Sequence, residues 1–253
     1  MSERERDLKA AGVVPAVADE DALAVADVRV LVREIQVCRG VLQPDRHGLG
    51  EPTRRVDDPE EHVGDGTTPG LAEEHFAHDG LITKHAVRAV ALAALRPMPG
   101  QLLWDLGTGA GSIAVEWCRT DPTCRAIGLE RKAERAANAR TNASELTLPG
   151  QFDVIDADLA RGLPEGLPDP DAVFIGGGAT KALVNQCRPR LPIGGRLVVH
   201  GVTMEAEMLV ETLHCDLGGD LIRFGVETAD VIGRLHGWKP ARTVVAWTWQ
   251  RTE

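Results

Sequence analysis

Three glycines that alternate with small residues form the most distinctive chemical pattern in this sequence. Gly107, Gly109 and Gly111 follow the apolar run Leu103–Leu106 and lead directly into a helical pattern. A loop of this kind lets bare backbone N–H groups and a helix N-terminus approach a ligand. We therefore expect a nucleotide-like cofactor to bind at this loop, which comprises Gly107, Thr108, Gly109, Ala110 and Gly111.

The spacing of these glycines separates several kinds of nucleotide site. A nicotinamide fingerprint needs a third glycine where this chain has Ser112, and a phosphate-binding loop needs a Gly-Lys-Ser/Thr run that does not follow. What remains is the pattern D-x-G-x-G-x-G, in which Asp105 precedes the first glycine by two residues. A tight glycine turn in an ordinary α/β protein is the alternative interpretation.

Further acidic positions agree with a cofactor site. Glu130 ends the second expected strand, 19 residues after Gly111, where a carboxylate can accept both hydroxyl protons of a ribose. The third expected strand leads into Ala157 and Asp158, which are placed to contact a base edge. Ligands of open α/β sheets bind at the carboxyl ends of the strands. Each acid taken alone is equally well a surface residue at a strand end.

Short β-rich runs alternate with helical patterns from residue 80 onward, which indicates an α/β fold. The expected strands are Gln101–Leu106, Cys124–Glu130, Phe152–Asp156, Asp171–Ile175, Gly195–His200, Leu221–Val226 and Arg242–Trp249. Helices are expected at His85–Arg96 with Thr83 as N-cap, and at Ser112–Arg119, Glu134–Leu146, Thr180–Leu191 and Glu205–Cys215. We expect a Rossmann-like, doubly wound sheet of seven mostly parallel strands with an antiparallel last strand. Only a loop, Gly233–Lys239, separates the last two strands, which should form a hairpin at the sheet edge.

The first part of the chain differs in composition. Residues 1–79 hold 18 acidic and 9 basic residues, a net charge of −9, whereas residues 80–253 hold 20 and 19. Ala22–Val37 has an amphipathic helical pattern, and residues 43–70 are rich in Pro, Gly and charged residues without a sustained period. We expect residues 1–69 to be a poorly ordered or remnant arm and linker, and residues 70–253 to be the functional domain.

Composition also restricts location and partners. The start is charged where a signal peptide turns apolar, and no apolar run reaches the ~18 residues of a membrane helix. The sequence has no dense basic patch of the kind that binds nucleic acid, and its five cysteines form no CxxC pair. We expect a cytoplasmic protein with reduced core cysteines and neither membrane nor nucleic acid as a partner. His75 and His78 share one short loop without a ligand cluster, so no metal site is expected.

The D-x-G-x-G-x-G loop resembles motif I of the class I S-adenosylmethionine-dependent methyltransferases. Residues 69–250 as a whole resemble the decarboxylating precorrin methyltransferases of cobalamin biosynthesis, which comprise the C-terminal half of precorrin-6Y C5,15-methyltransferases and its stand-alone relative. The resemblance rests on Glu73–Lys84, whose final Thr-Lys pair directly precedes a helix, on Pro99–Gly111, and on Phe174–Gly178.

The resemblance implies S-adenosylmethionine as cofactor, with Thr83 and Ala157 as binding residues beside the glycine loop, Asp105, Glu130 and Asp158. It also implies methylation of carbon 15 of a precorrin tetrapyrrole, loss of the ring C acetate carboxylate, and a homo-oligomer, a tetramer in relatives of this type. About 70 residues precede the matching region, too few for the domain that methylates carbon 5. We therefore expect a separate protein to methylate carbon 5, and His47–Pro52 only faintly resembles that domain.

A substrate with many carboxylates needs cationic partners at the strand ends. The candidates are Lys84, Lys181, Arg88, Arg234 and Arg242. Gly176, Gly177 and Gly178 open a helix and are expected to line the substrate. Lys84, Lys181 and His200 are the candidate catalytic residues for proton transfer. The alternative for each cation is a solvated or structural charge, and the alternative for His200 is a core or sheet-edge histidine.

Two other functions remain open at this point. The fold is compatible with a methyltransferase for another small molecule or for RNA, although the near-neutral catalytic half argues against RNA. The second alternative function is that of an assembly partner, in which the chain is an inactive cofactor-binding remnant of a bifunctional enzyme. Trp247 and Trp249 lie two residues apart on the last strand, and their shared face suits a core or a subunit contact.

Overall fold

The computed structural model describes residues 66–253. The expected helix Ala22–Val37, Cys38 and nearly all of the expected N-terminal arm lie outside these residues. The boundary expected between residues 69 and 70 therefore stays a prediction.

Seven strands form one sheet in the order β3-β2-β1-β4-β5-β9-β6. Neighbours from β3 to β5 run parallel, whereas β9 is antiparallel to both β5 and β6. The expected doubly wound sheet with an antiparallel last strand is confirmed. The strands are β1 Leu102–Leu106, β2 Arg125–Glu130, β3 Phe152–Asp156, β4 Ala172–Ile175, β5 Arg196–Gly201, β6 Asp220–Phe224 and β9 Val244–Gln250.

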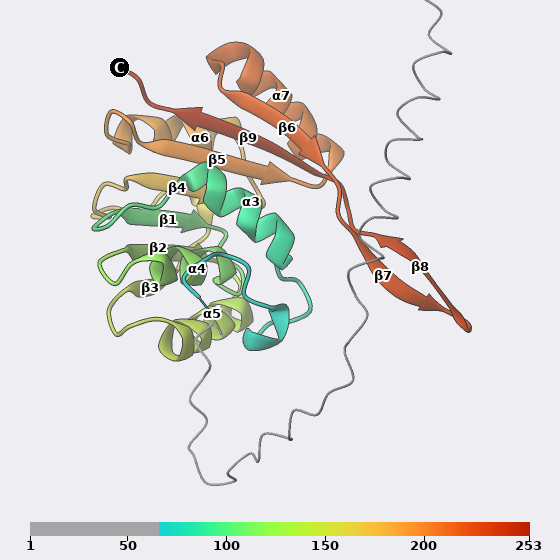
Figure 1. The fold of residues 1–253 in the computed structure, drawn as a ribbon. Helices are drawn as coiled ribbons and strands as arrows, with labels where there is room; N and C mark the ends of the chain where they lie inside the picture. Colours follow the sequence, from blue (N-terminus) through green and yellow to red (C-terminus); the bar gives the residue numbers. More distant parts are fainter. Residues whose placement is uncertain (1–65) are drawn as a thin grey trace, which may run out of the picture. The chain divides into compact units, whose positions relative to one another are not determined.

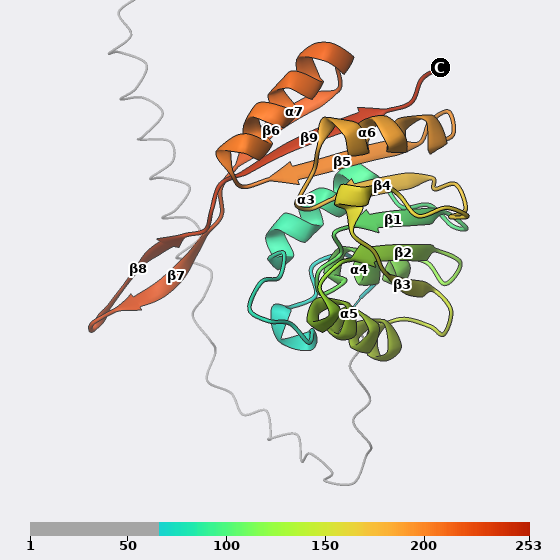
Figure 2. The same cartoon turned by 180° about the vertical axis from the view of Figure 1, so that it is seen from behind.

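Helices cover both faces of this sheet (Figures 1 and 2). One apolar core joins the sheet to α3, α4 and α5, and a second joins it to α6 and α7. Successive strand residues point to opposite faces, so Leu103 enters the first core and Trp104 the second, both fully buried. The helices are α3 His85–Leu95, α4 Ser112–Thr120, α5 Ala133–Leu146, α6 Lys181–Cys187 and α7 Met204–Leu217, with short 3-10 turns at η1 Glu73–His75, η2 Leu159–Arg161 and η3 Arg188–Arg190.

Two helix boundaries differ from expectation. Thr83 does not cap α3, because Lys84 occupies the N-cap position and no side chain caps that end. The helix expected to reach Leu191 ends at Cys187 and continues as η3, where Pro189 has no N–H to extend the α-helical hydrogen bonds. Thr180 caps α6 by accepting a hydrogen bond from the Leu183 N–H at 3.1 Å.

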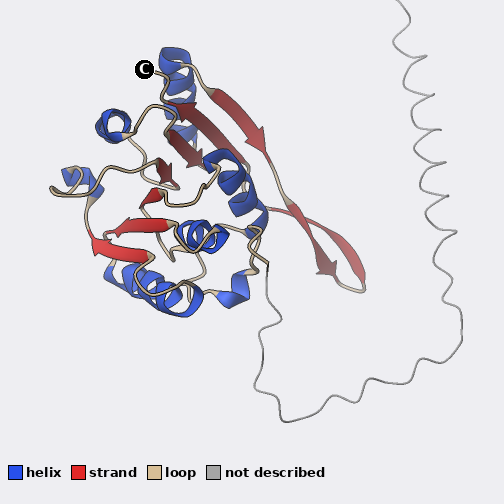
Figure 3. Ribbon diagram, turned by 60° about the vertical axis from the view of Figure 1, so that its left-hand side comes forward, coloured by secondary structure: helices blue, strands red, loops and turns tan. Residues whose placement is uncertain are grey.

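The segment between the last two sheet strands is a second hairpin. β7 Glu227–Ile232 and β8 Leu235–Pro240 pair with each other and with no strand of the main sheet, and they extend away from it in Figures 1 and 3. The expectation of a simple loop over Gly233–Lys239 was therefore wrong. The two strands that it separates are antiparallel neighbours as expected, with β6 at the sheet edge.

Most cysteines of the described chain are core residues. Cys118, Cys124 and Cys187 are buried, whereas Cys215 is exposed, so the expectation was wrong for Cys215. Within residues 66–253, no helix is long and apolar enough to cross a membrane.

Candidate functional site

A pocket of about 910 Å³ lies where the parallel strands end. The chain order of the strands reverses between β1 and β4, so the loops that follow these two strands diverge and leave a crevice. Most of the expected site residues line it, namely Thr83, Lys84, Asp105, Gly107, Thr108, Gly109, Ala110, Glu130, Ala157, Asp158, Gly176, Gly177, Gly178 and His200.

Two of the three loop glycines, Gly109 and Gly111, have different structural roles. All three have positive φ angles, which side chains rarely adopt. A Cβ on Gly109 would meet no atom within 4 Å, so this residue leaves backbone open to the pocket. A Cβ on Gly111 would lie 2.6 Å from the Phe152 ring, and Gly111 does not line the pocket. Gly109 therefore admits a ligand, whereas Gly111 lets α4 pack against the sheet.

Two buried carboxylates flank the loop. Asp105 accepts a hydrogen bond from the Thr108 hydroxyl at 2.6 Å, and burial, with a contribution from Glu130, raises its pKa to about 6. Glu130 accepts from the N–H groups of Gly109 at 3.1 Å and Lys132 at 2.9 Å. A carboxylate offers about four lone pairs, so Glu130 keeps acceptors for a pair of ligand hydroxyl groups.

The loop after β3 closes the same end of the pocket. The Ala157 N–H donates to the Glu130 carbonyl at 3.0 Å, which holds the β3 end beside the β2 end. Asp158 accepts from the Ala160 N–H at 3.2 Å and caps η2. Ala157 and Asp158 thus line the pocket next to Glu130.

Arg88 does not face the pocket, contrary to the sequence hypothesis. Its side chain is fully buried, and Nε donates to Glu116 of α4 at 2.6 Å. Its other nitrogens donate to the carbonyls of Thr83 and Leu71. Arg88 therefore fixes the segment that precedes α3 and places Thr83 and Lys84 at the pocket.

Asn142 of α5 joins that same segment to the glycine loop. Its amide accepts from the Ala77 N–H at 2.7 Å and donates to the carbonyls of Ala77 at 2.9 Å and Ala110 at 2.7 Å. The side chain is fully buried. No sequence motif marks this residue, because its partners lie 65 and 32 positions away.

Four cations line the pocket without an ion pair to another described residue. They are Lys84, Arg131, Lys132 and Arg242. Arg131 and Lys132 were not expected at the pocket, although they directly follow Glu130.

Two other cation candidates are not part of the pocket. Lys181 does not line it, because its Nζ pairs with Asp216 of α7 at 2.8 Å. Arg234 lies in the turn between β7 and β8 and does not line the pocket either.

His200 is the buried imidazole of the pocket. It lies at the end of β5, with 5% of its surface exposed, and burial lowers its pKa to about 4. Its ring contacts Phe174 edge-on at 5.2 Å and Phe224 at 6.1 Å between centroids. Neither ring nitrogen has a hydrogen-bond partner in the described chain.

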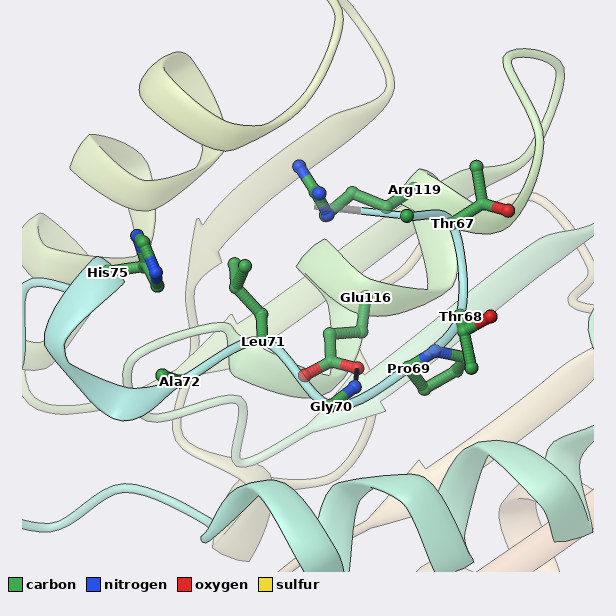
Figure 4. A pocket seen from close by; sticks show the side chains of 10 residues that line it. Thr67, Thr68, Pro69, Gly70, Leu71, Ala72, His75, Glu116 and Arg119 are labelled. Atoms are coloured by element: carbon green, nitrogen blue, oxygen red, sulfur yellow. Dashed lines mark hydrogen bonds between the residues drawn. The ribbon is translucent and has the colours of Figure 1, made fainter. Parts of the chain in front are cut away.

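A second cavity of about 320 Å³ lies beside the first described residues (Figure 4). Its carboxylate, Glu116, already accepts from the Gly70 N–H at 2.6 Å and from Arg88. The labelled residues of Figure 4 show Glu116 directed at Gly70. We assign no ligand to this cavity, since its acid serves the fold.

Sheet order, glycine loop and strand-end carboxylates together define a class I methyltransferase fold. The sequence model of the family described as "Precorrin methyltransferase domain" matches residues 74–251. The chain belongs to this family.

Named relatives agree with this assignment. The chain is 45% identical over 183 residues to a decarboxylating precorrin-6Y C(5,15)-methyltransferase of Sinorhizobium sp, covering 72% of this chain and 44% of that protein. It is 27% identical over 179 residues to the decarboxylating cobalt-precorrin-6B C(15)-methyltransferase of Salmonella typhi, covering 68% of this chain and 90% of that one. The match therefore spans less than half the length of the Sinorhizobium relative.

A solved structure supports the same grouping. The C-terminal domain of precorrin-6Y C5,15-methyltransferase from Rhodobacter capsulatus superposes with a TM-score of 0.69 at 41% identity. The match covers 74% of this chain and 100% of that domain.

Proposed function

We propose that this protein methylates carbon 15 of a precorrin tetrapyrrole with S-adenosylmethionine and removes the carboxylate of the ring C acetate arm, as a step of cobalamin biosynthesis. The observation that carries the proposal is the open Gly109 backbone between two buried carboxylates, in a chain of this family. The two catalytic outcomes are those in the names of the relatives.

The pocket residues fit the cofactor by charge and shape. S-adenosylmethionine, when bound, supplies an electrophilic methyl group. Asp105 and the glycine loop would hold its cationic amino-acid end, Glu130 its ribose hydroxyls, and Ala157 and Asp158 its adenine edge. Thr83 and Lys84 line the same pocket, and Arg88 holds their backbone by hydrogen bonds to both carbonyls.

Other residues of the pocket lining fit a large acidic substrate. Lys84 and Arg242 give cationic partners for acetate and propionate arms, whereas Phe174, Val87 and Val244 give an apolar surface. A reduced tetrapyrrole brings its own electron-rich carbon. The protein's contribution is therefore to position that carbon near the methyl group and to exclude water.

Mass spectrometry of the reaction products tests this proposal. The purified full chain is incubated with S-adenosylmethionine and a precorrin-6 to precorrin-7 pool. We expect a gain of one methyl group with loss of CO₂. Gly109→Arg should abolish both by filling the loop, whereas Gly150→Arg should retain them, because its φ angle is also positive but it lies outside the pocket.

Each other product pattern has a distinct meaning. A gain of two methyl groups would show that this chain also methylates carbon 5, which we assign to a separate protein. Cofactor binding without any mass change would favour the inactive remnant and contradict the proposed activity.

We further propose that the protein is a cytoplasmic homo-oligomer, a tetramer by resemblance to its relatives. The support is the β7–β8 hairpin, whose apolar side chains Val231, Ile232, Leu235 and Trp238 are at least 65% exposed. An isolated two-stranded hairpin is marginally stable in water, so a second copy of the chain is the partner that we assign to it.

A further inference from the structure

We propose that His200 and the two aromatic rings beside it form the subsite for the acetate arm that loses CO₂. This inference rests on the proposed function. It assigns the carboxylate that is lost as CO₂ to one part of the pocket and the carboxylates that the substrate keeps to another part.

The imidazole of His200 has no partner within the protein. Both of its nitrogens are buried without a hydrogen-bond partner in the described chain, and a buried polar group left unpaired is destabilising. His200 lines the ligand pocket. A ligand acceptor is therefore the partner that the N–H of this ring lacks.

His200 lies away from the expected cofactor residues in the sheet. Strand alternation places His200 on the same face of the sheet as Val198 of β5, and Phe174 of β4 belongs to the core on that face. This face is the one that α3 covers. Glu130, which would hold the ribose, ends β2, and β1 and β4 lie between β2 and β5 in the sheet. His200 therefore serves the substrate side of the pocket.

His200 also differs in charge from the cations of the pocket. Lys84 and Arg242 are positively charged, whereas His200 is neutral at pH 7. Burial alone lowers the pKa of His200 to about 4, with no contribution from a nearby charge. A cation would stabilise a carboxylate and hold it in place. A neutral donor between two phenyl rings orients the group and leaves its charge poorly solvated.

That environment favours CO₂ loss for a simple reason. In the reaction the bond between the methylene and carboxylate carbons breaks, CO₂ leaves, and the electron pair passes into the conjugated macrocycle. The methyl group adds to the macrocycle as a cation equivalent, so the two steps together balance in charge without an external oxidant or reductant. Because the negative charge leaves the carboxylate in the transition state, a dry apolar pocket destabilises the ground state more than the transition state.

The test compares His200→Phe with His200→Gln in the full chain. Phe keeps a ring of similar size between Phe174 and Phe224 but removes both nitrogens. Gln keeps one donor and one acceptor. His214→Gln is the matched control, because His214 also has an unpartnered ring nitrogen but lies on α7 outside the pocket.

The readouts are the ratio of methylated to methylated-and-decarboxylated product by mass spectrometry, the KM for the precorrin pool, and cofactor affinity by calorimetry. We expect His200→Phe to raise that product ratio or the KM by about tenfold or more, the value of a hydrogen bond to a charged group. Cofactor affinity should not change, the thermal midpoint should not fall, and His200→Gln should partly restore CO₂ loss. His214→Gln should behave like the natural chain.

Other outcomes overturn the inference. An unchanged product ratio and KM in His200→Phe would exclude the subsite, and equal losses in His200→Phe and His214→Gln would show a general effect of histidine replacement. If His200→Phe does not fold, His200→Leu replaces it, because Leu also removes both ring nitrogens. Retained CO₂ loss with an unchanged KM in His200→Leu would exclude the subsite. A natural chain that neither methylates nor decarboxylates would instead contradict the proposed function.

Discussion

Asp105, which we propose to hold the cationic end of the cofactor, has a raised pKa. Burial raises its pKa from 3.8 to about 6, with Glu130 adding to the shift. A raised carboxyl pKa contributes stability that is present below pH 3.8 and lost as pH rises through about 6. The ionised Asp105 is thus costly in the protein alone, and a bound cation offsets that cost.

We therefore expect the affinity for S-adenosylmethionine to fall by up to about tenfold per pH unit below pH 6. Calorimetric titration between pH 5 and pH 7.5 measures this change. Asp105→Asn should bind the cofactor more weakly at pH 7, and its affinity should not change with pH. Asp153 is an exposed acid on β3 outside the pocket, so Asp153→Asn should keep the natural affinity and its pH dependence. A flat profile in the natural chain would show that Asp105 does not face the bound cation.

The sequence was informative about residues whose role is local. The glycine loop and Glu130 could be predicted because strand, turn and strand-end positions follow from short patterns. Arg88 and Lys181 could not be assigned, since their partners Glu116 and Asp216 lie 28 and 35 positions away and only the fold brings them together. Charge alone does not distinguish a ligand partner from a structural ion pair.

At the scale of elements, the Arg88–Glu116 pair fastens α3 to α4 and to the preceding segment. Both side chains are buried, and removing one partner of a buried ion pair typically costs about 3–5 kcal/mol. We expect Arg88→Met to lower the free energy of unfolding by that amount in urea denaturation. Arg140→Met is the control, because its pair with Asp156 is about half exposed and contributes only about 0–1 kcal/mol. Equal losses would contradict a structural role specific to Arg88.

Asn142 joins the segment that precedes α3 to the glycine loop, and it does not line the pocket. Asn142→Ala leaves the N–H and carbonyl of Ala77 and the carbonyl of Ala110 without this partner. We expect a loss of cofactor affinity of about tenfold, equivalent to one hydrogen bond, measured by calorimetry. Asn138→Ala on the same helix makes no such contacts and should bind normally. Unchanged affinity in Asn142→Ala would show that the glycine loop holds its shape unaided.

The elements themselves were predictable to different degrees. The seven sheet strands carry apolar runs that the buried sheet requires, and all seven were expected near their observed places. β7 was missed because every one of its residues is exposed, so its sequence shows no alternation of buried and exposed side chains. Burial against a core is what makes a strand visible in a sequence.

At the scale of the whole molecule, the chain matches one domain of longer relatives. It covers 44% of the Sinorhizobium protein but 100% of the solved C-terminal domain. The pocket draws on segments from Gly80 to Val244, so nearly all of the residues that we propose for cofactor and substrate binding lie within this one domain.

The proposed assembly of several copies of the chain depends on the β7–β8 hairpin. Val231, Ile232, Leu235 and Trp238 are at least 65% exposed, and the hairpin pairs with no strand of the main sheet. Apolar burial contributes about 25 cal/mol per Å². We expect the natural chain to sediment as an oligomer and a Leu235→Glu, Trp238→Lys double variant to sediment as a smaller species. Ile193→Glu, at an equally exposed apolar site away from the hairpin, should keep the natural mass. A natural chain that stays monomeric at every concentration in analytical ultracentrifugation would contradict the assembly, and an oligomer unaffected by the double variant would place the contact elsewhere.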